Sequence, residues 1–294
     1  MNLRHSLSIT LSNSGLILKV LLYTTVLFLI VFALFTAITE PIIEALGSDV
    51  DLMEELEDDI AALFGIGSRR PGGSINEFLN KNADSLARAA VLYLLLFILL
   101  RFGVAFAIVP AGFYIYNKMS ANFNCGFINA TVSTGGKAAL FALTYTALTV
   151  PADILILAGC YFLATWLGGA VGIPGVAIAL LILIALLALR LSLTARWIPE
   201  MISENLKFKD AAKAFFTRYD SAFVKEIYPS MLFLLIFAGG LTLATAVETL
   251  GIVPIVVLPA AFVAHTAISM TGYFNVMKRK YYIDERVIDP NERF

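Results

Sequence analysis

Three ionisable side chains, Arg101, Asp153 and His265, fall inside long apolar stretches of the sequence. Such groups are unfavourable in a lipid bilayer unless they are paired, and they commonly mark ion or proton pathways in membrane proteins. Arg101 precedes Lys118 by 17 residues, and Asp153 follows Lys137 by 16 residues. At the rise of an α-helix, both side chains lie ~25 Å from the same boundary of the apolar region. The sequence therefore predicts an Arg101–Asp153 ion pair.

Such a pair is either a structural lock between two spans or part of a transport site. If Arg101 instead extended outward to the headgroups, the ion pair would not form. His265 lies near the middle of another apolar stretch, beside Thr266 and Ser269. A neutral imidazole can bond a hydroxyl or carbonyl group there. Three further charged residues at span ends are expected to reach the headgroups or water: Arg190, Arg196 and Glu248.

The residue types that hydrolytic or metal chemistry needs are scarce. His5 and His265 are the only histidines, and Cys125 and Cys160 are the only cysteines. This excludes an H-E-x-x-H zinc site, and the sequence holds no Cys-pair metal motif, G-x-S-x-G elbow or phosphate-binding loop. We therefore expect no enzyme activity, no catalytic residue, no cofactor and no metal. Without a long basic arm, a nucleic-acid partner is not expected either.

Six long apolar stretches carry the ionisable groups described above. Hydrophobic residues make up 59% of the chain and charged residues 15%, and the mean hydropathy of +0.84 excludes a water-soluble domain. Each stretch is near or above the ~20 residues that a helix needs to cross a bilayer. The sequence predicts an all-α polytopic membrane protein, a single membrane domain over 1–294 with six transmembrane helices: 16–38, 89–116, 138–163, 171–195, 231–247 and 252–277.

The distribution of Lys and Arg predicts how the chain is oriented. Two lie in the N-terminal segment, two between the second and third spans, seven around the gap after the fourth span and five beyond the last span. These all fall on one side, whereas the opposite side receives four, all between the first two spans. Because Lys and Arg accumulate in cytoplasmic loops, both termini are expected to face the cytoplasm.

The gap at 39–88 predicts an extracytoplasmic acidic helical insertion. It contains eleven carboxylates and only four Lys and Arg residues. Apolar residues recur at helical spacing within 50–64, and Ser74 and Glu77 match a capping box that opens another helix. The acidic run lacks the glycine and the ligand spacing of a calcium loop, so a solvated helix face is the preferred interpretation.

Residues 208–219 predict an amphipathic helix on the cytoplasmic side. At helical spacing, the apolar residues from Phe208 to Tyr219 gather on one face. The opposite face carries three basic residues that suit anionic lipid headgroups: Lys209, Lys213 and Arg218. A helix that packs between the fourth and fifth spans would show the same pattern, so both interpretations stay open.

The six spans are expected to pair as three consecutive hairpins, each preceded by a short cytoplasmic segment. The second helices of the last two hairpins begin alike, at 172–175 (GIPG) and 251–254 (GIVP). Proline suits the first turn of a helix, where its missing N–H has no intrahelical partner. An internal repeat is one explanation of this likeness, and chance similarity between apolar segments is the other.

The stretch at 196–202 (RWIPEMI), followed by 205–216, resembles the cytoplasmic connector of a broad group of prokaryotic six-span membrane proteins. That group includes the membrane domain attached to some glycerophosphodiester phosphodiesterases. The resemblance covers about twenty residues and the hairpin arrangement. It implies a bacterial or archaeal cytoplasmic membrane. It implies no phosphodiesterase activity, because the catalytic barrel of those enzymes has no counterpart among these residues.

Together these features predict a non-enzymatic accessory, scaffold or lipid-interacting component of the prokaryotic cytoplasmic membrane. The alternative is a small transporter or channel subunit with a polar site near Arg101 and Asp153. The expected partners are membrane lipids, and a second membrane protein or further copies of the same chain are the other candidates.

A cysteine-accessibility experiment tests the orientation. In a variant without Cys125 and Cys160, Ser68→Cys should react with a membrane-impermeant maleimide added from the extracytoplasmic side, because the positive-inside rule puts residue 68 outside. Lys209→Cys should react only after the membrane is permeabilised. Labelling of Lys209→Cys from outside would contradict both the orientation and the number of spans.

Overall fold

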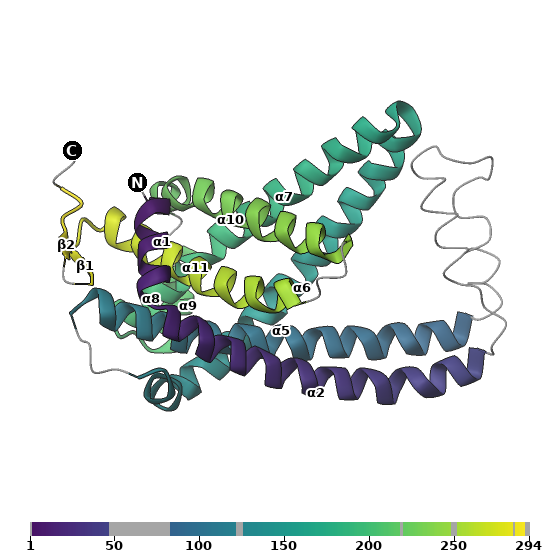
Figure 1. The fold of residues 1–294 in the computed structure, drawn as a ribbon, viewed down its shortest axis with the longest axis horizontal. Helices are drawn as coiled ribbons and strands as arrows, with labels where there is room; N and C mark the ends of the chain where they lie inside the picture. Colours follow the sequence, from purple (N-terminus) through teal and green to yellow (C-terminus); the bar gives the residue numbers. More distant parts are fainter. Residues whose placement is uncertain are drawn as a thin grey trace. The chain divides into compact units, whose positions relative to one another are not determined.

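The structure is a computed structural model that describes residues 2–46, 83–121, 126–217, 220–247, 252–284 and 286–291. Nearly all of these residues are helical (Figure 1). In chain order the elements are α1 (Asn2–Ser12), α2 (Ser14–Leu46), α5 (Ala83–Met119), α6 (Phe127–Val171), α7 (Ile173–Ala195), α8 (Trp197–Ser203), α9 (Phe208–Thr217), α10 (Ser221–Val247), α11 (Ile252–Val276), β1 (Tyr281–Ile283) and β2 (Arg286–Ile288).

Six helices among the described residues are long and apolar enough to cross a membrane. They comprise Ser14–Thr39, Ala90–Met119, Phe127–Val171, Ile173–Ser203, Ser221–Thr242 and Ile255–Val276. The protein is thus a helical, multi-pass integral membrane protein by the length and composition of its helices, as the apolar stretches predicted.

Several helices extend beyond the spans that hydropathy marked. The third predicted span, 138–163, is part of α6, a single helix of 45 residues. α10 begins at Ser221 rather than at the predicted Met231. Its start is capped by Asp220, whose Oδ1 accepts hydrogen bonds from the backbone N–H of Ala222 at 2.9 Å and of Phe223 at 3.3 Å. Hydropathy detects only the lipid-compatible part of a helix, while backbone hydrogen bonding continues through its polar ends.

The fold divides into two compact units. Unit 1 contains Met1–Val26, Phe102–Leu148 and Ile184–Phe294, and unit 2 contains Leu27–Arg101 and Thr149–Leu183. Helices α2, α5, α6 and α7 contribute residues to both units.

Unit 1 is organised around α11. In this helix 56% of the most apolar stretch is buried, against 28% or less in the other five candidate spans. Both α10 and α1 pack along it. The hydroxyl groups of Ser6 on α1 and Thr271 on α11 share a hydrogen bond of 2.6 Å, and both residues are fully buried. The first eleven helical residues are therefore a structural part of the bundle.

The short helix α8 lies in the core of unit 1. Trp197, Ile198 and Met201 are each 1% exposed. The indole ring of Trp197 contacts Phe141 of α6 edge-on at 5.2 Å and stacks on Phe208 of α9 at 5.8 Å between ring centroids. The segment whose sequence resembles a cytoplasmic connector is thus buried within unit 1.

The C-terminal segment forms a small β-hairpin that the helical patterns did not predict. β1 and β2 pair antiparallel, with Tyr281 opposite Ile288 and Ile283 opposite Arg286. Asp284, in the turn, has a left-handed backbone with φ of 52°. Tyr281 is fully buried and belongs to the main core of unit 1. Strands of three residues are too short to leave a periodic signal in sequence.

Unit 2 consists of helix segments whose large apolar side chains are mostly exposed. α2 and α5 meet where the hydroxyl groups of Thr39 and Tyr93 lie 3.1 Å apart. α6 and α7 are joined by a tight turn at Gly172, which has φ of +75°. Gly175 of α7 packs against the backbone carbonyl of Leu167, where any Cβ would clash. The glycines of the 172–175 segment therefore allow this close helical hairpin.

The predicted extracytoplasmic insertion at 39–88 is described only at its ends. Its first residues continue α2 to Leu46, and its last residues belong to α5, which starts at Ala83. The predicted helix at 50–64 and the capping box at Ser74 and Glu77 lie outside the described residues, as do Glu248 and Arg218.

Candidate functional site

Arg101 on α5 and Asp153 on α6 form the ion pair that their positions in the spans predicted, and this prediction is confirmed. Nη2 of Arg101 donates to Oδ2 of Asp153 at 2.8 Å, a charge-assisted hydrogen bond. The side chain of Asp153 is 9% exposed and that of Arg101 is 25% exposed. Both residues belong to unit 2. The expectation of an Arg101 that extends away from its partner is therefore wrong.

Local packing directs the carboxylate inward. Thr149, Val150 and Asp153 are buried along one side of α6, whereas Ile154 and Leu155 are exposed. Ile154 and Leu155 thus face the lipid-exposed surface, whereas the carboxylate of Asp153 faces α5. Pro151 lies inside the same part of α6 and removes one backbone donor from the helix.

The ion pair explains how two charged side chains are tolerated within the candidate spans. Together they carry no net charge, and each supplies the partner that the other needs in a medium of low polarity. As it stands, the arrangement can lock α5 against α6.

His265 lies on α11 in unit 1 and is 9% exposed. The neighbouring hydroxyls donate to their own helix: Thr266 Oγ1 to the Phe262 carbonyl at 3.0 Å and Ser269 Oγ to the His265 carbonyl at 2.8 Å. Neither hydroxyl therefore donates to the imidazole. His265 is therefore a buried polar group of unit 1, whereas the Arg101–Asp153 pair belongs to unit 2.

A hydrogen-bonded chain in unit 1 was not predicted. Nδ1 of His5 lies 2.6 Å from the hydroxyl of Tyr281. That hydroxyl donates to Oδ1 of Asn275 at 3.4 Å, and Nδ2 of Asn275 donates to Oε1 of Glu226 at 3.2 Å. A His5 tautomer with its proton on Nδ1 completes the series from the N-terminal helix to α10. The chain ties α1, β1, α11 and α10 together.

Burial shifts both ring groups at the start of this chain toward neutrality. Burial lowers the pKa of His5, and the positive charges of the N-terminus and Arg4 lower it further. Burial, together with the negative charge of Glu226, raises the pKa of Tyr281 well above its ordinary value. The 2.6 Å contact between His5 and Tyr281 therefore joins two neutral groups near neutral pH.

Two arginines that were expected to extend toward headgroups bond within unit 1 instead. Arg190 donates to the hydroxyl of Tyr145 at 2.9 Å. Arg196 donates through Nε to Oε1 of Glu200 at 2.7 Å, and its Nη1 lies 3.3 Å from Oδ2 of Asp220. Arg196 and Glu200 have side chains only 12% and 5% exposed. The outward extension predicted for Arg196 is wrong, because two acids of the chain itself hold its guanidinium group.

The amphipathic helix exists as α9, over Phe208–Thr217. Its apolar face packs on unit 1: Ala211 is fully buried in the main core, and Phe208 stacks on Trp197. Lys209 and Lys213 are exposed. Packing against the protein and display of basic residues thus occur on opposite faces of one helix. The third basic residue of the prediction, Arg218, lies outside the described residues.

Within the described part of the chain, no three His, Cys, Asp or Glu residues cluster so that they could hold a metal ion. Comparison of the sequence and structure with protein-family models, curated proteins and solved structures finds no match. The fold and these sites therefore define the protein by class, as a multi-pass membrane protein with six candidate spans.

A double-mutant cycle tests the ion pair. Arg101→Leu or Asp153→Leu alone should lower the free energy of unfolding in lipid-like detergent by about 3 kcal/mol, because each leaves the other charge unpaired in a poorly polar site. Arg101→Leu/Asp153→Leu should recover most of that loss. Equilibrium unfolding of the four proteins gives the coupling energy, and a double variant no more stable than either single variant would contradict the pairing.

Proposed function

We propose that the protein is a non-enzymatic accessory or scaffold component of the prokaryotic cytoplasmic membrane that interacts with lipid. The observation that carries this proposal is α9. Ala211 is buried in the core, while Lys209 and Lys213 are exposed. A helix fixed to the protein by its apolar face holds its charged face in a constant direction. Such a face suits the negatively charged surface of the cytoplasmic leaflet.

The surroundings of α9 support this role. Lys207, just before the helix, is also exposed, and Lys137 donates to Oδ1 of Asn205 at 3.1 Å. The exposed face also carries Asp210, so the charge around α9 is predominantly but not wholly basic. Each Lys or Arg near an anionic membrane contributes on the order of 1 kcal/mol of attraction. Several such residues together provide a stable orientation at the headgroups.

The proposed topology has both termini in the cytoplasm and six spans paired as three hairpins. The α6–α7 turn at Gly172 and the packing of α10 along α11 support the second and third hairpins. The acidic helical insertion predicted at 39–88 then lies on the extracytoplasmic side. This arrangement puts α9 and the many Lys and Arg residues of the cytoplasmic loops on the leaflet that attracts them.

The apolar surface of unit 2 favours a partner role within the membrane. Large side chains such as Phe32, Leu95 and Phe162 are more than half exposed. In a bilayer these contact lipid, a second membrane protein or another copy of the chain.

The polar side chains support the proposal of a non-enzymatic role. The ion pairs and hydrogen bonds that they form link the helices to one another.

The α9 proposal is tested with the full-length protein. Lys209→Gln/Lys213→Gln should reduce the affinity for phosphatidylglycerol by about 2 kcal/mol and leave phosphatidylcholine binding unchanged, because only the charge attraction is removed. Lipid titrations followed by native mass spectrometry measure both affinities. A matched control, Arg88→Gln/Lys225→Gln, removes two exposed positive charges outside α9. Equal losses in the two double variants would contradict a specific role of α9.

The Arg101–Asp153 pair favours one alternative, a small transporter or channel subunit. An acid whose side chain is 9% exposed within a candidate span is the kind of group that carries protons or ions when its partner releases it. Asp153→Asn should then abolish proton or ion flux in proteoliposomes while the protein stays folded, because the amide cannot carry the charge. Wild-type protein that conducts no better than empty liposomes would exclude this alternative.

A further inference from the structure

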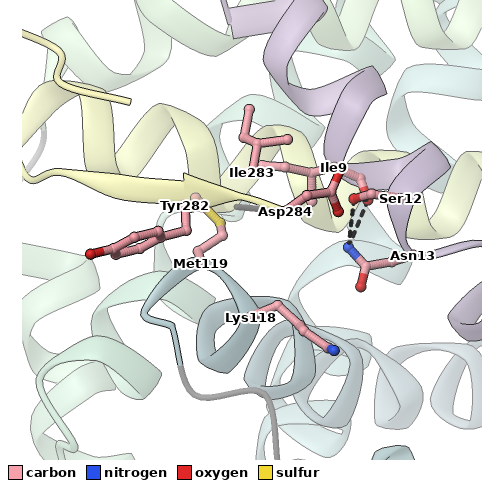
Figure 2. Close-up of a pocket in the computed structure, with 8 residues that line it drawn as sticks. All are labelled: Ile9, Ser12, Asn13, Lys118, Met119, Tyr282, Ile283 and Asp284. Atoms are coloured by element: carbon pink, nitrogen blue, oxygen red, sulfur yellow. Dashed lines mark hydrogen bonds between the residues drawn. The ribbon is translucent and has the colours of Figure 1, made fainter. Parts of the chain in front are cut away.

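A cavity of about 290 Å³ opens in unit 1 between the end of α1, the end of α5 and the C-terminal hairpin (Figure 2). Its lining includes Ser12, Asn13, Lys118, Met119, Tyr282 and Asp284. Ligand cavities range upward from about 300 Å³, so this one suits a small polar group rather than a large cofactor. None of its residues takes part in the sites described above.

The cavity lies at the boundary of the membrane. Asn13 directly precedes the candidate span Ser14–Thr39, and Met119 is the last residue of the candidate span Ala90–Met119. Two spans therefore begin and end at the walls of the same cavity. The ends of apolar spans coincide with the headgroup layer. A group that enters this cavity is consequently at the depth of a lipid headgroup.

One lysine lines the cavity, and a second lysine contacts the same aromatic ring as the first. Nζ of Lys118, which lines it, lies 5.9 Å from the centre of the Tyr114 ring, and Nζ of Lys19 lies 5.8 Å from the centre of the same ring. Attraction to the ring electrons stabilises both ammonium groups beside Tyr114. A phosphate in the cavity can accept a charge-assisted hydrogen bond from Lys118.

Two other polar groups of the cavity, Asn13 and Asp284, can accept hydrogen bonds. Asn13 is 8% exposed, and its amide nitrogen donates to the Ile9 carbonyl at 2.8 Å and to the Ser12 hydroxyl at 3.3 Å. These bonds occupy the amide N–H groups and direct Oδ1 away from Ile9 and Ser12 (Figure 2). Asp284 supplies an exposed carboxylate from the hairpin turn. A carboxylate and an amide oxygen together suit an ammonium group with N–H donors.

We propose that this cavity binds the phosphoethanolamine headgroup of a phospholipid. Lys118 contacts the phosphate, and Asp284 and Asn13 accept hydrogen bonds from the primary ammonium. The proposal deepens the lipid-interacting role proposed above, but it concerns a cavity formed by α1, α5 and the hairpin rather than the basic face of α9. The chemistry predicts discrimination between ammonium groups, because phosphatidylcholine has the same net charge but no N–H to donate.

Lipid titration of the full-length protein by native mass spectrometry tests this recognition. Wild-type protein should bind phosphatidylethanolamine about tenfold more tightly than phosphatidylcholine, the effect of hydrogen bonds to a charged group. Asp284→Asn should remove that preference. Lys118→Gln should weaken the binding of both lipids equally. Asp210→Asn and Lys225→Gln are the matched controls, since each changes one exposed charge outside the cavity.

Further comparisons distinguish a phosphoethanolamine headgroup from an anionic lipid and from soluble phosphate. Equal wild-type binding of the two lipids, or a preference that survives Asp284→Asn, would overturn the proposal. Tighter binding of phosphatidylglycerol that Lys118→Gln removes would show an anion site without ammonium recognition. Displacement of the lipid by millimolar inorganic phosphate would show a site for soluble phosphate. Unchanged thermal midpoints in lipid-free detergent confirm that the variants fold.

The outcome is independent of the α9 proposal. Loss of phosphatidylglycerol binding in Lys209→Gln/Lys213→Gln, with the ethanolamine preference intact, assigns two separate lipid sites. The reverse result, with no α9 effect but a preference that depends on Asp284, retains the cavity alone.

Discussion

The absence of water in the hydrocarbon core is the constraint on which the rest of this structure depends. Every backbone N–H and C=O group in an apolar span has to be bonded within the chain, and a continuous helix achieves this without help from neighbours. The same constraint acts on side chains. It explains why hydroxyl groups such as Ser269 bond back to their own helix, and why the charges of Arg101 and Asp153 are joined at 2.8 Å.

Polar interactions in unit 1 join elements that are far apart in sequence. The contact of His5 with Tyr281 connects residues separated by 276 positions. Arg196 bonds both Glu200 of α8 and Asp220, the capping residue of α10. Hydrogen bonds fix directions and distances, whereas apolar contacts between helices allow sliding. These bonds therefore define how α1, α8, α10 and the hairpin are arranged around α11.

In unit 2, exposed apolar side chains predominate instead. Its helix segments leave many large apolar side chains exposed, and their closest approach depends on glycine at the α6–α7 turn. In lipid, an exposed Leu or Phe carries no penalty, so this unit requires little internal core. Its exposed apolar side chains are free to contact lipid.

The sequence by itself determined the class of protein, the approximate spans and the Arg101–Asp153 pair, because hydropathy and helical rise are local properties of a chain. It also indicated α9, whose two faces repeat at helical spacing. From the sequence alone, this helix could either face lipid headgroups or pack between the fourth and fifth spans. The packing of Ala211 and Phe208 against the core shows that its apolar face contacts the protein. Helix ends were misjudged, since caps such as Asp220 act beyond the apolar residues.

Only the tertiary structure decided the rest. Burial of the RWIPEMI segment, the bonds of Arg190 and Arg196, and the chain from His5 to Glu226 each depend on residues brought together from distant parts of the sequence. The cavity that joins Asn13, Lys118 and Asp284 is of the same kind. A single sequence records which side chains are polar, but the partner of each one is set by the distances that folding creates.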